Sequence, residues 1–382
     1  MTRLRGLAWD HRRCWGPLDA SVGPYSAANP GLEIEWDRRS LYEFGEGALG
    51  PVLATYDLVV FDHPFIGDIA QDQLMVPFDA HLSAEKIRFF EQDSVGASWR
   101  SYEKNGRQWA LPIDAACQVA SYRPDLLERY GAVPRSHEDV VELGRRARKN
   151  GKWLGLPSVP TDAMCMLLTL GHPQEDGEQF IAREMVEQAI GQLRELAALS
   201  HPNSSKWNPI RCYDHMIALD DVVYVPFAFG YVNYAANTDR PYLRFADVPT
   251  PSSAGALLGG AGIGVSAQSR HKQEAIDYAQ FLCSPRYQRG DYVRSGGQPG
   301  SLAAWKDVAV NHLCGNFFSS TLQTINSSYL RPTHPGFIAF FRECAPHVAA
   351  AIAGDMPAAE LAEHVNRLYR ETRHGQPQRS VA

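Results

Sequence analysis

Short apolar runs that stop at polar residues mark the first third of the chain and predict β-strands. They cover residues 4–9, 32–36 and 56–62, and the connections between them are long enough to hold helices. The third run, YDLVVFD, is continuously apolar at its centre, which is typical of a strand buried on both faces of a parallel sheet. A strand, a crossover and another strand in repetition predict an α/β layer.

Helical periodicity dominates the middle of the chain. Apolar residues recur at intervals of three and four over residues 185–199, which predicts an amphipathic helix. Ser136 followed by Asp139 has the pattern of a capping box and predicts a helix that continues to residue 148. Further along, residues 222–225 predict a strand, followed by an aromatic loop over residues 226–234.

Length, composition and charge narrow the class of protein. With 382 residues, 45% of them hydrophobic and 21% charged, the chain is globular and long enough for two lobes. Its formal net charge of −6, without a basic stripe, argues against nucleic acid as a partner. Because no run of 18 apolar residues occurs, we expect no membrane insertion.

The spacing of the cysteines and the first residues of the chain indicate the cellular compartment and whether a metal or cofactor is expected. The seven cysteines are scattered, without a CxxC pair or zinc-ligand spacing, and predict reduced thiols and no metal. The beginning, MTRLRGLAWDH, lacks the apolar segment of a secretory signal peptide. We therefore expect a cytoplasmic protein, or a periplasmic one if the start is misassigned or export is non-standard. The glycine-rich residues 255–264 lack the context of a dinucleotide fingerprint, and no P-loop occurs, so no cofactor is expected.

Two segments resemble the sugar-type family of bacterial solute-binding proteins of ABC importers. In the first, GALLGGAGIGVSAQSRHKQEAIDYAQFLCSP leads into YQRGDYVRSGGQPGSLAAW, with a glycine-rich strand, an "S.HK.EA" helix start, "L.SP..Q" and a "GG.P" turn in the family's order. The second segment, RQWALPIDAACQVASYRPDLLERYG, resembles the family's hinge strand and the short helix after it. In this order and spacing the motifs are more specific for the fold than for the ligand.

The resemblance implies an α/β, two-lobed periplasmic-binding-protein fold of type II with an interlobe cleft. It implies a first lobe of residues 1–113 plus 262–308 and a second lobe of residues 117–257 plus 310–382. Hinge strands would lie near residues 112–119 and 255–262, where glycine permits backbone angles that other residues disfavour. The implied function is binding of a small polar, sugar- or sugar-acid-like solute by a monomer, as the partner of an ABC permease or as a cytoplasmic derivative of such a protein.

Polar and aromatic residues follow the predicted strands of the first lobe. In open α/β sheets the ligand crevice lies beyond the carboxyl ends of the strands, so these side chains are expected to contact the ligand. An alternative is a metal site of Asp10, His11, Asp62 and His63, and a further one is ordinary turn chemistry. The candidates at these strand ends are Trp9, Asp10, His11, Trp36, Asp37, Asp62 and His63.

Other candidates come from the second lobe and the turn after the glycine pair. Phe227 and Tyr231 belong to an unusually aromatic segment, whose rings either stack on a sugar or fill the core. Gln298 follows Gly296-Gly297 in a turn that is expected to face the cleft. With Trp9 as a stacking platform, Trp9→Ala is predicted to weaken binding and leave the fold intact.

Cys117 raises an alternative from a different class, a cytoplasmic enzyme that reuses the binding fold. Thiaminase I, which shares the two-lobed fold, carries its catalytic cysteine on the comparable strand. That chemistry requires a lowered thiol pKa and an acidic neighbour, for which Asp114, Asp220 and Asp221 are candidates. Nothing flanking Cys117 is basic, so the preferred interpretation is that Asp114 and Gln118 are hydrogen-bonding groups on the cleft floor.

Overall fold

The computed structural model describes residues 1–174, 179–235, 241–249 and 255–373, and within them ten strands form two sheets. Seven strands pair in the order β2-β1-β3-β10-β6-β8-β7, β9 joins β6, and β4 and β5 form a separate hairpin. The strands are β1 (Thr2–Trp9), β2 (Leu32–Arg39), β3 (Leu58–Phe61), β4 (Glu103–Lys104), β5 (Arg107–Gln108), β6 (Leu111–Tyr122), β7 (Trp153–Leu154), β8 (Val222–Phe229), β9 (Arg244–Ala246) and β10 (Leu258–Val265).

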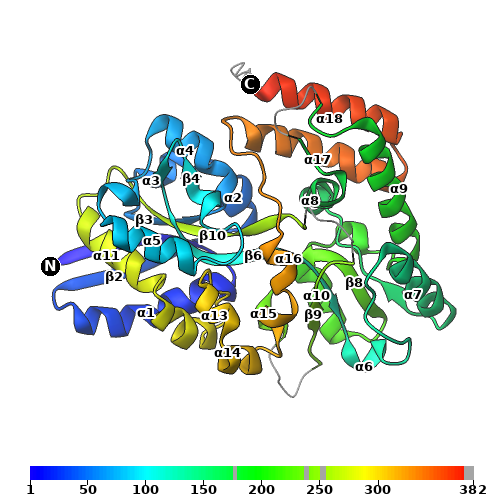
Figure 1. Cartoon of the computed structure of the whole chain (residues 1–382), viewed down its shortest axis with the longest axis horizontal. Helices are drawn as coiled ribbons and strands as arrows, with labels where there is room; N and C mark the ends of the chain where they lie inside the picture. Colours follow the sequence, from blue (N-terminus) through cyan, green and yellow to red (C-terminus); the bar gives the residue numbers. More distant parts are fainter. Residues whose placement is uncertain (175–178, 236–240, 250–254, 374–382) are drawn as a thin grey trace.

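Helices cover both ends of this continuous sheet, and the molecule is two-lobed (Figure 1). The helices that flank β1, β2 and β3 are α1 (Arg12–Ala28), α2 (Leu41–Glu46), α3 (Gly50–Leu53), α4 (Ile66–Asp72), α5 (Ala84–Asp93), α11 (Lys272–Leu282), α12 (Pro285–Tyr287) and α13 (Leu302–Lys306). The others are α6 (Pro124–Leu127), α7 (His137–Lys149), α8 (Pro160–Gly171), α9 (Arg183–Leu199), α10 (Pro209–Ala218), α14 (Val308–Leu313), α15 (Phe317–Ser320), α16 (Leu322–Asn326), α17 (Phe337–Ala353) and α18 (Ala358–Arg373).

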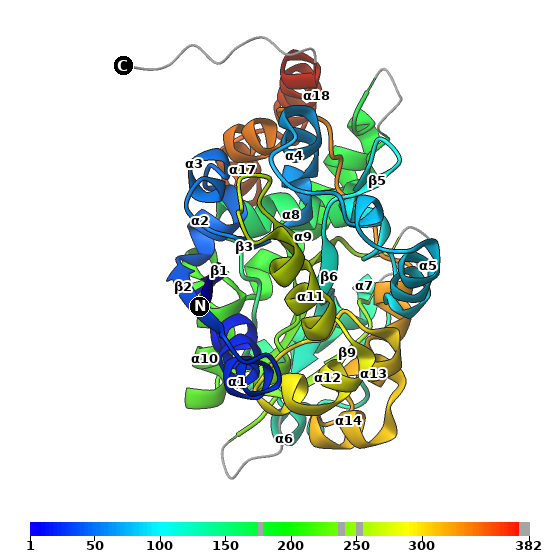
Figure 2. The same cartoon turned by 90° about the vertical axis from the view of Figure 1, so that its left-hand side faces the viewer.

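The first lobe is built around the parallel strands β2, β1 and β3. Alternate residues of β3 enter opposite hydrophobic clusters, Leu58 and Val60 on one face and Val59 and Phe61 on the other. This two-sided burial is why the strand reads as a continuous apolar run. Figure 2, in which this lobe faces the viewer, shows α1 and α11 in front of the sheet.

Two long strands connect the lobes. β6 pairs with β10 through Leu111–Cys117 and then with β8 through Gln118–Tyr122, so one strand belongs to both halves of the sheet. Gly260 of β10 has a φ of +110°, and a Cβ there would lie 2.5 Å from the carbonyl oxygen of Asp114. Only glycine permits this approach of the two crossing strands. The lobe boundaries and hinge ranges expected from the sequence overlap β6 and β10 and stay predictions.

The second lobe packs its helices around β8 and β7. The capping box predicted at Ser136 and Asp139 is present at the start of α7. The aromatic loop predicted from residue 226 is wrong, because β8 continues through Pro226 to Phe229. The β6–β8 register shifts between Val119 and Ser121, which accommodates a proline that cannot donate a backbone hydrogen bond. Among the described residues, no helix is both long and apolar enough to cross a membrane.

Candidate functional site

A cavity of about 290 Å³ lies between the two lobes. Its walls come from the carboxyl ends of β1, β3 and β8 and from the first turns of α1, α8 and α10. α2 and α17 close it from opposite lobes, and Gly259 and Gly260 of β10 form part of its floor. Strand ends and helix N-termini therefore converge at the place where α/β folds bind ligands.

Arg13 is fixed at one side of the cavity by the buried carboxylate of Asp114. Its Nε lies 2.7 Å from Oδ2, its Nη2 binds Oδ1, and its Nη1 donates to the carbonyl oxygen of Gly230 at 3.0 Å. Burial alone would lower the pKa of Arg13, but the charge of Asp114 raises it above the ordinary value. Burial raises the pKa of Asp114 and the charge of Arg13 opposes this shift, and the two-point contact between guanidinium and carboxylate favours the ionised pair. The bond to Gly230 ties the first lobe to the end of β8.

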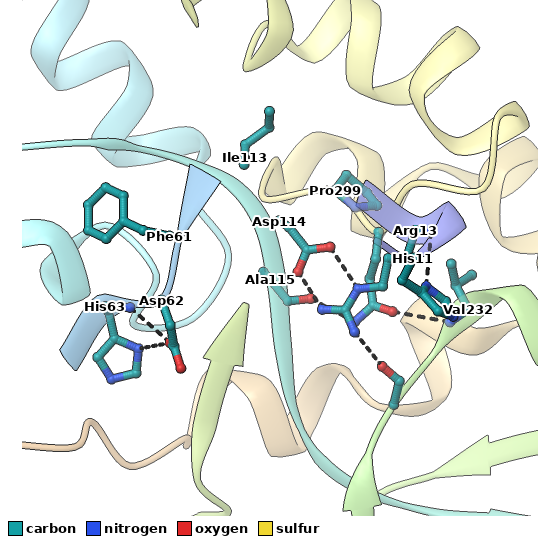
Figure 3. Close-up of polar contacts among 12 residues, drawn as sticks. His11, Arg13, Phe61, Asp62, His63, Ile113, Asp114, Ala115, Val232 and Pro299 are labelled. Carbon is teal, nitrogen blue, oxygen red and sulfur yellow. Dashed lines mark hydrogen bonds and ion pairs between the residues drawn. The ribbon is translucent and has the colours of Figure 1, made fainter. Parts of the chain in front are cut away.

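A second buried ion pair joins Asp62 to Arg331. The Nη2 of Arg331 lies 2.7 Å from both carboxylate oxygens of Asp62, at the end of β3. The Asp62 carboxylate also caps the backbone N–H of His63, and its Oδ1 lies 3.2 Å from the Nδ1 of that ring (Figure 3). Burial would raise the pKa of Asp62, but the charge of Arg331 and the His63 contact lower it to about 2. Burial and the charge of Arg331 lower the pKa of His63, so this imidazole is neutral.

A third polar contact crosses from α2 to the second lobe. The Oε1 of Glu46 accepts a hydrogen bond from the hydroxyl of Thr161 at 2.8 Å. Its Oε2 lies 3.7 Å from the Nε of Arg342 on α17. Outside the cavity, Asn233 donates across the lobes to the carbonyl oxygen of Gly296 at 2.9 Å. The two lobes are therefore in direct contact both at the cavity and away from it.

Aromatic rings supply much of the remaining wall. Trp9 is 3% exposed and packs on Phe44 with ring centroids 4.5 Å apart, and its indole Nε1 has no hydrogen-bond partner among the described residues. Tyr231 lies across the guanidinium of Arg13, 4.8 Å from the ring centroid. Burial raises the pKa of Tyr231 to about 12, so its hydroxyl stays protonated and can donate.

Asp162 is the carboxyl group of the cavity that lacks a partner. It lies in the first turn of α8 and is 8% exposed. Among the described residues no side chain or backbone N–H binds its carboxylate, and burial raises its pKa to about 8. A buried carboxyl with an unused hydrogen-bonding capacity is a group that a ligand would satisfy.

Three of the sequence-predicted site residues, Trp9, Asp62 and Tyr231, line this cavity. Trp9 also belongs to the hydrophobic core of the first lobe, so the expectation that Trp9→Ala leaves the fold intact is revised: large-to-small changes in a core destabilise.

Four other candidates lie beside the cavity without lining it. Asp10 is exposed, and the His63 ring is completely buried behind Asp62. His11 caps α1 by accepting a hydrogen bond from the backbone N–H of Arg13, and burial together with the charge of Arg13 lowers its pKa to about 4. Asp114 lies under Arg13, so its part is to hold that guanidinium in place.

Gln118, Phe227 and Gln298 make contacts within the protein, and none of them lines this cavity. Gln118 accepts a hydrogen bond from Thr169 inside the second lobe, and Phe227 belongs to that lobe's core. Gln298 accepts from the backbone N–H of Val232 at 3.1 Å and donates to the carbonyl oxygen of Ala115 at 2.8 Å. Both ends of the Gln298 amide and the acceptor oxygen of Gln118 are thus occupied by the protein.

Trp36 and Asp37 lie away from the cavity, because β2 is an edge strand that continues past them to Arg39. The Trp36 ring covers Gly6, where an added Cβ would lie 2.4 Å from the indole. Asp37 is exposed and pairs with Arg5 at 2.8 Å. Predicting both as ligand contacts required β2 to end earlier than it does.

The metal alternative is not supported by the placement of its four residues. Figure 3 shows Asp62 and His63 on one side of the Asp114–Arg13 pair and His11 on the other. In the described part of the chain, one group has ligand-like geometry: His201, His215 and Asp221. The Nδ1 of His201 accepts the backbone N–H of Asn203 at 3.1 Å, so the proton of the neutral ring is on Nε2, the atom that would have to bind the metal. The group is better explained by hydrogen bonds, including 2.7 Å between His215 Nε2 and Asp221 Oδ1.

Cys117 does not have the properties of a nucleophile. The residue is 2% exposed, and burial raises the pKa of its thiol far above the ordinary value. Asp114 is engaged by Arg13, while Asp220 pairs with Arg123 and keeps 69% of its side chain exposed. Asp221 binds His215, and Asp247, whose charge also raises the thiol pKa, accepts two hydrogen bonds from Thr324. A protonated buried cysteine of this kind is inert.

Sequence reasoning missed Arg13, Asp162 and Arg331, and selected Phe227 where Phe229 lines the cavity. A local signal exists for two of them, since Arg13 and Asp162 fall in the first turns of helices that follow strand or loop segments. No local pattern marks Arg331, whose partner Asp62 is 269 residues away.

Comparison with known proteins places these observations in a family context. The family model for bacterial extracellular solute-binding proteins matches residues 16–289. Maltose-bound MalE3 of T. maritima is similar with a TM-score of 0.83 and 17% identity, covering 97% of this chain and 100% of that one. The GacH receptor of Streptomyces glaucescens GLA.O, solved unliganded and with acarbose, has a TM-score of 0.81 and 15% identity over 98% and 99% of the two chains. A solute-binding protein of Agrobacterium radiobacter K84 in complex with ribitol has a TM-score of 0.79 and 15% identity over 98% of both. At such identities the structural likeness establishes the fold.

Proposed function

This chain belongs to the family of bacterial extracellular solute-binding proteins, as its motifs predicted, and we propose that its interlobe cavity binds a small polar ligand of the sugar or polyol class. In this role the chain would deliver the ligand to an ABC permease. Such a role requires a location outside the cytoplasmic membrane, the periplasmic alternative considered from the sequence. Fractionation of the native cells, with the chain recovered outside the cytoplasm, is the expected result; a purely cytoplasmic chain would contradict the transport role.

The observation that carries the proposal is the cavity between the two lobes, with an unpartnered carboxyl group in its wall. Its volume of about 290 Å³ lies near the lower end of the roughly 300–1,000 Å³ typical of small-molecule sites, so it suits a ligand of one or two rings or a short polyol. The Asp162 carboxyl lines the cavity without a protein partner in the described structure and would bind hydroxyl groups.

Aromatic and planar polar groups are mixed in the way that sugar recognition requires. Rings such as Trp9 and Phe229 cover the apolar C–H faces of a sugar, while carboxylates and guanidinium groups bind its hydroxyls. The maltose, acarbose and ribitol in the titles of the similar structures are ligands of this chemical kind.

Contacts made with both lobes favour the closed arrangement. Hydrogen bonds from Thr161 to Glu46 and from Arg13 to Gly230 join the two lobes. A ligand in the cavity would add further contacts with both lobes. A ligand shifts such an equilibrium only by the contacts that are specific to the closed state.

A thermal-shift screen tests the proposal with sugars, polyols, sugar acids, small carboxylates, polyamines and thiamin-like heterocycles. A ligand at about a hundredfold its Kd stabilises by roughly 2.7 kcal/mol, which raises the Tm of a chain of this length by about 3 °C. We expect saturable shifts confined to sugars or polyols, with the compound recovered unaltered. A response confined to another class, silence across the panel or a chemically changed compound would overturn the proposal.

A pair of matched variants connects any shift to the cavity. Tyr42 lines the cavity and is 62% exposed, so Tyr42→Ala should fold normally and lose about three- to tenfold in affinity with the stacking contact. Phe89 on α5 is 51% exposed and does not line the cavity, so Phe89→Ala should bind as wild type does. Equal affinities of the two variants would place the ligand elsewhere.

A further inference from the structure

The charges around the cavity do not balance. Arg13 is neutralised by Asp114, Arg331 by Asp62, and Arg342 lies against Glu46. Once these pairs are counted, one carboxyl group of the wall, Asp162, has no cation beside it in the described structure. The protein thus leaves a single carboxyl group of the cavity wall without a counter-cation.

The position of Asp162 makes this imbalance costly in the empty protein. The residue is more than nine-tenths buried, and an ionised carboxylate without a hydrogen-bond partner is strongly disfavoured in such a place. Its backbone lies in the first turn of α8, where the helix N-terminus favours negative charge. A cation that enters the cavity would therefore meet a carboxylate that is ready to ionise.

The aromatic wall suits a cation as well. Rings from both lobes line the same space, and an ammonium group lying over an aromatic face is attracted by its π electrons. Tyr231 already accommodates the guanidinium of Arg13 in this way at 4.8 Å. The rings of this wall are Trp9, Tyr42, Phe44, Phe229, Tyr231 and Phe341.

We propose that the ligand carries a protonated amine that binds to Asp162, so that the natural substrate class is an amino sugar or an aminated polyol. This inference rests on the proposed function and narrows it from polyols in general to cationic ones. A carboxylate ligand is disfavoured, because both arginines of the wall, Arg13 and Arg331, are already neutralised by their own partners. A neutral polyol would satisfy the hydrogen bonds of Asp162 without supplying the cation that favours its ionised form.

Three compounds with the same six-carbon chain test the charge of the ligand. D-Glucamine, sorbitol and gluconate differ at one end, which is an aminomethyl, a hydroxymethyl or a carboxylate group. Isothermal titration of the full chain at pH 7 should give an affinity for glucamine at least about tenfold higher than for sorbitol, because hydrogen bonds between charged groups are the stronger ones. Gluconate should bind more weakly than sorbitol.

Two variants test whether the preference for glucamine over sorbitol depends on Asp162. Asp162→Asn keeps the shape of the side chain and removes its charge, so the preference for glucamine over sorbitol should fall to within about twofold. Asp72 on α4 is exposed and lies outside the cavity, so Asp72→Asn should retain the full preference. An unchanged preference in Asp162→Asn would overturn the assignment of the amine to this residue.

The outcomes separate this inference from the proposed function. Binding of sorbitol or gluconate as tight as that of glucamine would overturn the cationic ligand and leave polyol binding standing. Silence of all three polyols, with a response to choline that Asp162→Asn removes, would overturn the polyol class and support the cation site. Silence of all three polyols and of choline would overturn both.

Discussion

Substituting Asp162 by asparagine should stabilise the empty protein increasingly as the pH rises. The unfolded carboxyl has an ordinary pKa of 3.8, whereas burial raises that of the folded protein to about 8. Between these values the folded wild type holds a proton that the unfolded chain has lost, so its stability falls as the pH rises. Asparagine binds no proton, and the variant is free of this dependence.

The magnitude follows from the proton linkage. One proton bound only by the folded state changes the free energy of unfolding by about 1.4 kcal/mol per pH unit. From pH 5 to pH 7 the variant should therefore gain about 3 kcal/mol relative to wild type. With an unfolding entropy of roughly 2 cal/mol/K per residue, this gain widens the difference in Tm by about 3 °C.

Melting curves of ligand-free wild type and Asp162→Asn at pH 5, 6 and 7 measure this difference. Asp72→Asn provides the control for removing an exposed carboxyl outside the cavity, and its difference from wild type should change less with pH than that of Asp162→Asn. A difference for Asp162→Asn that stays constant from pH 5 to pH 7 would show that the carboxyl of the folded protein is already ionised over this range. The reasoning from burial would then be refuted.

Three further predictions concern the buried pair, the thiols and the indole. Asp62→Asn should lower the free energy of unfolding at pH 7 by about 3–5 kcal/mol, because Arg331 keeps a buried charge without its partner. In urea titrations this loss should be smaller at pH 3, since the pKa of Asp62 is about 2 and its stabilising charge is lost as the pH falls toward that value; equal losses at both pH values would contradict the ion pair. All seven cysteines are buried, so Ellman's reagent should react rapidly with none of them in the native protein and with all after denaturation, and a fast reaction mapped to Cys117 would revive the nucleophile hypothesis. Trp9→Phe should weaken ligand binding and cost less stability than the roughly 3–5 kcal/mol expected for Trp9→Ala, as measured by calorimetry and urea titration, whereas unchanged binding would remove the indole from the site.

Local sequence patterns were sufficient to predict several strands and helices and some of the residues that line the cavity. The apolar run around residues 58–61 became the doubly buried β3, and the Ser136–Asp139 box begins α7 as expected. The order of the family motifs led to the two-lobed fold. Trp9 and Asp62 could be selected because they lie at the carboxyl ends of strands, and Tyr231 because it belongs to the aromatic segment. Asp10, His11 and His63 follow the same strand ends and do not line the cavity, so the strand-end rule locates the crevice but not each contact.

Pairing with distant segments decides where a strand ends and which of its side chains reach the cavity. The end of β2 is set by pairing with β1 up to the Trp9–Arg39 pair, which leaves Trp36 and Asp37 within the strand. β8 passes through Pro226 because the register of β6 shifts opposite it, and this brings Phe229, not Phe227, to the cavity. Periodicity is a local property and contains neither the register nor the position of the last paired residue.

The sequence by itself determined which segments form strands and helices, which family fold they build and where along the chain the crevice begins. The tertiary structure alone decided which charges meet. Arg13 finds Asp114 across 101 residues and Arg331 finds Asp62 across 269, whereas Asp162 is left without a counter-charge in the described structure. The physical reason is that ionisation and pairing inside a protein depend on burial and distance, which arise only when remote segments pack together.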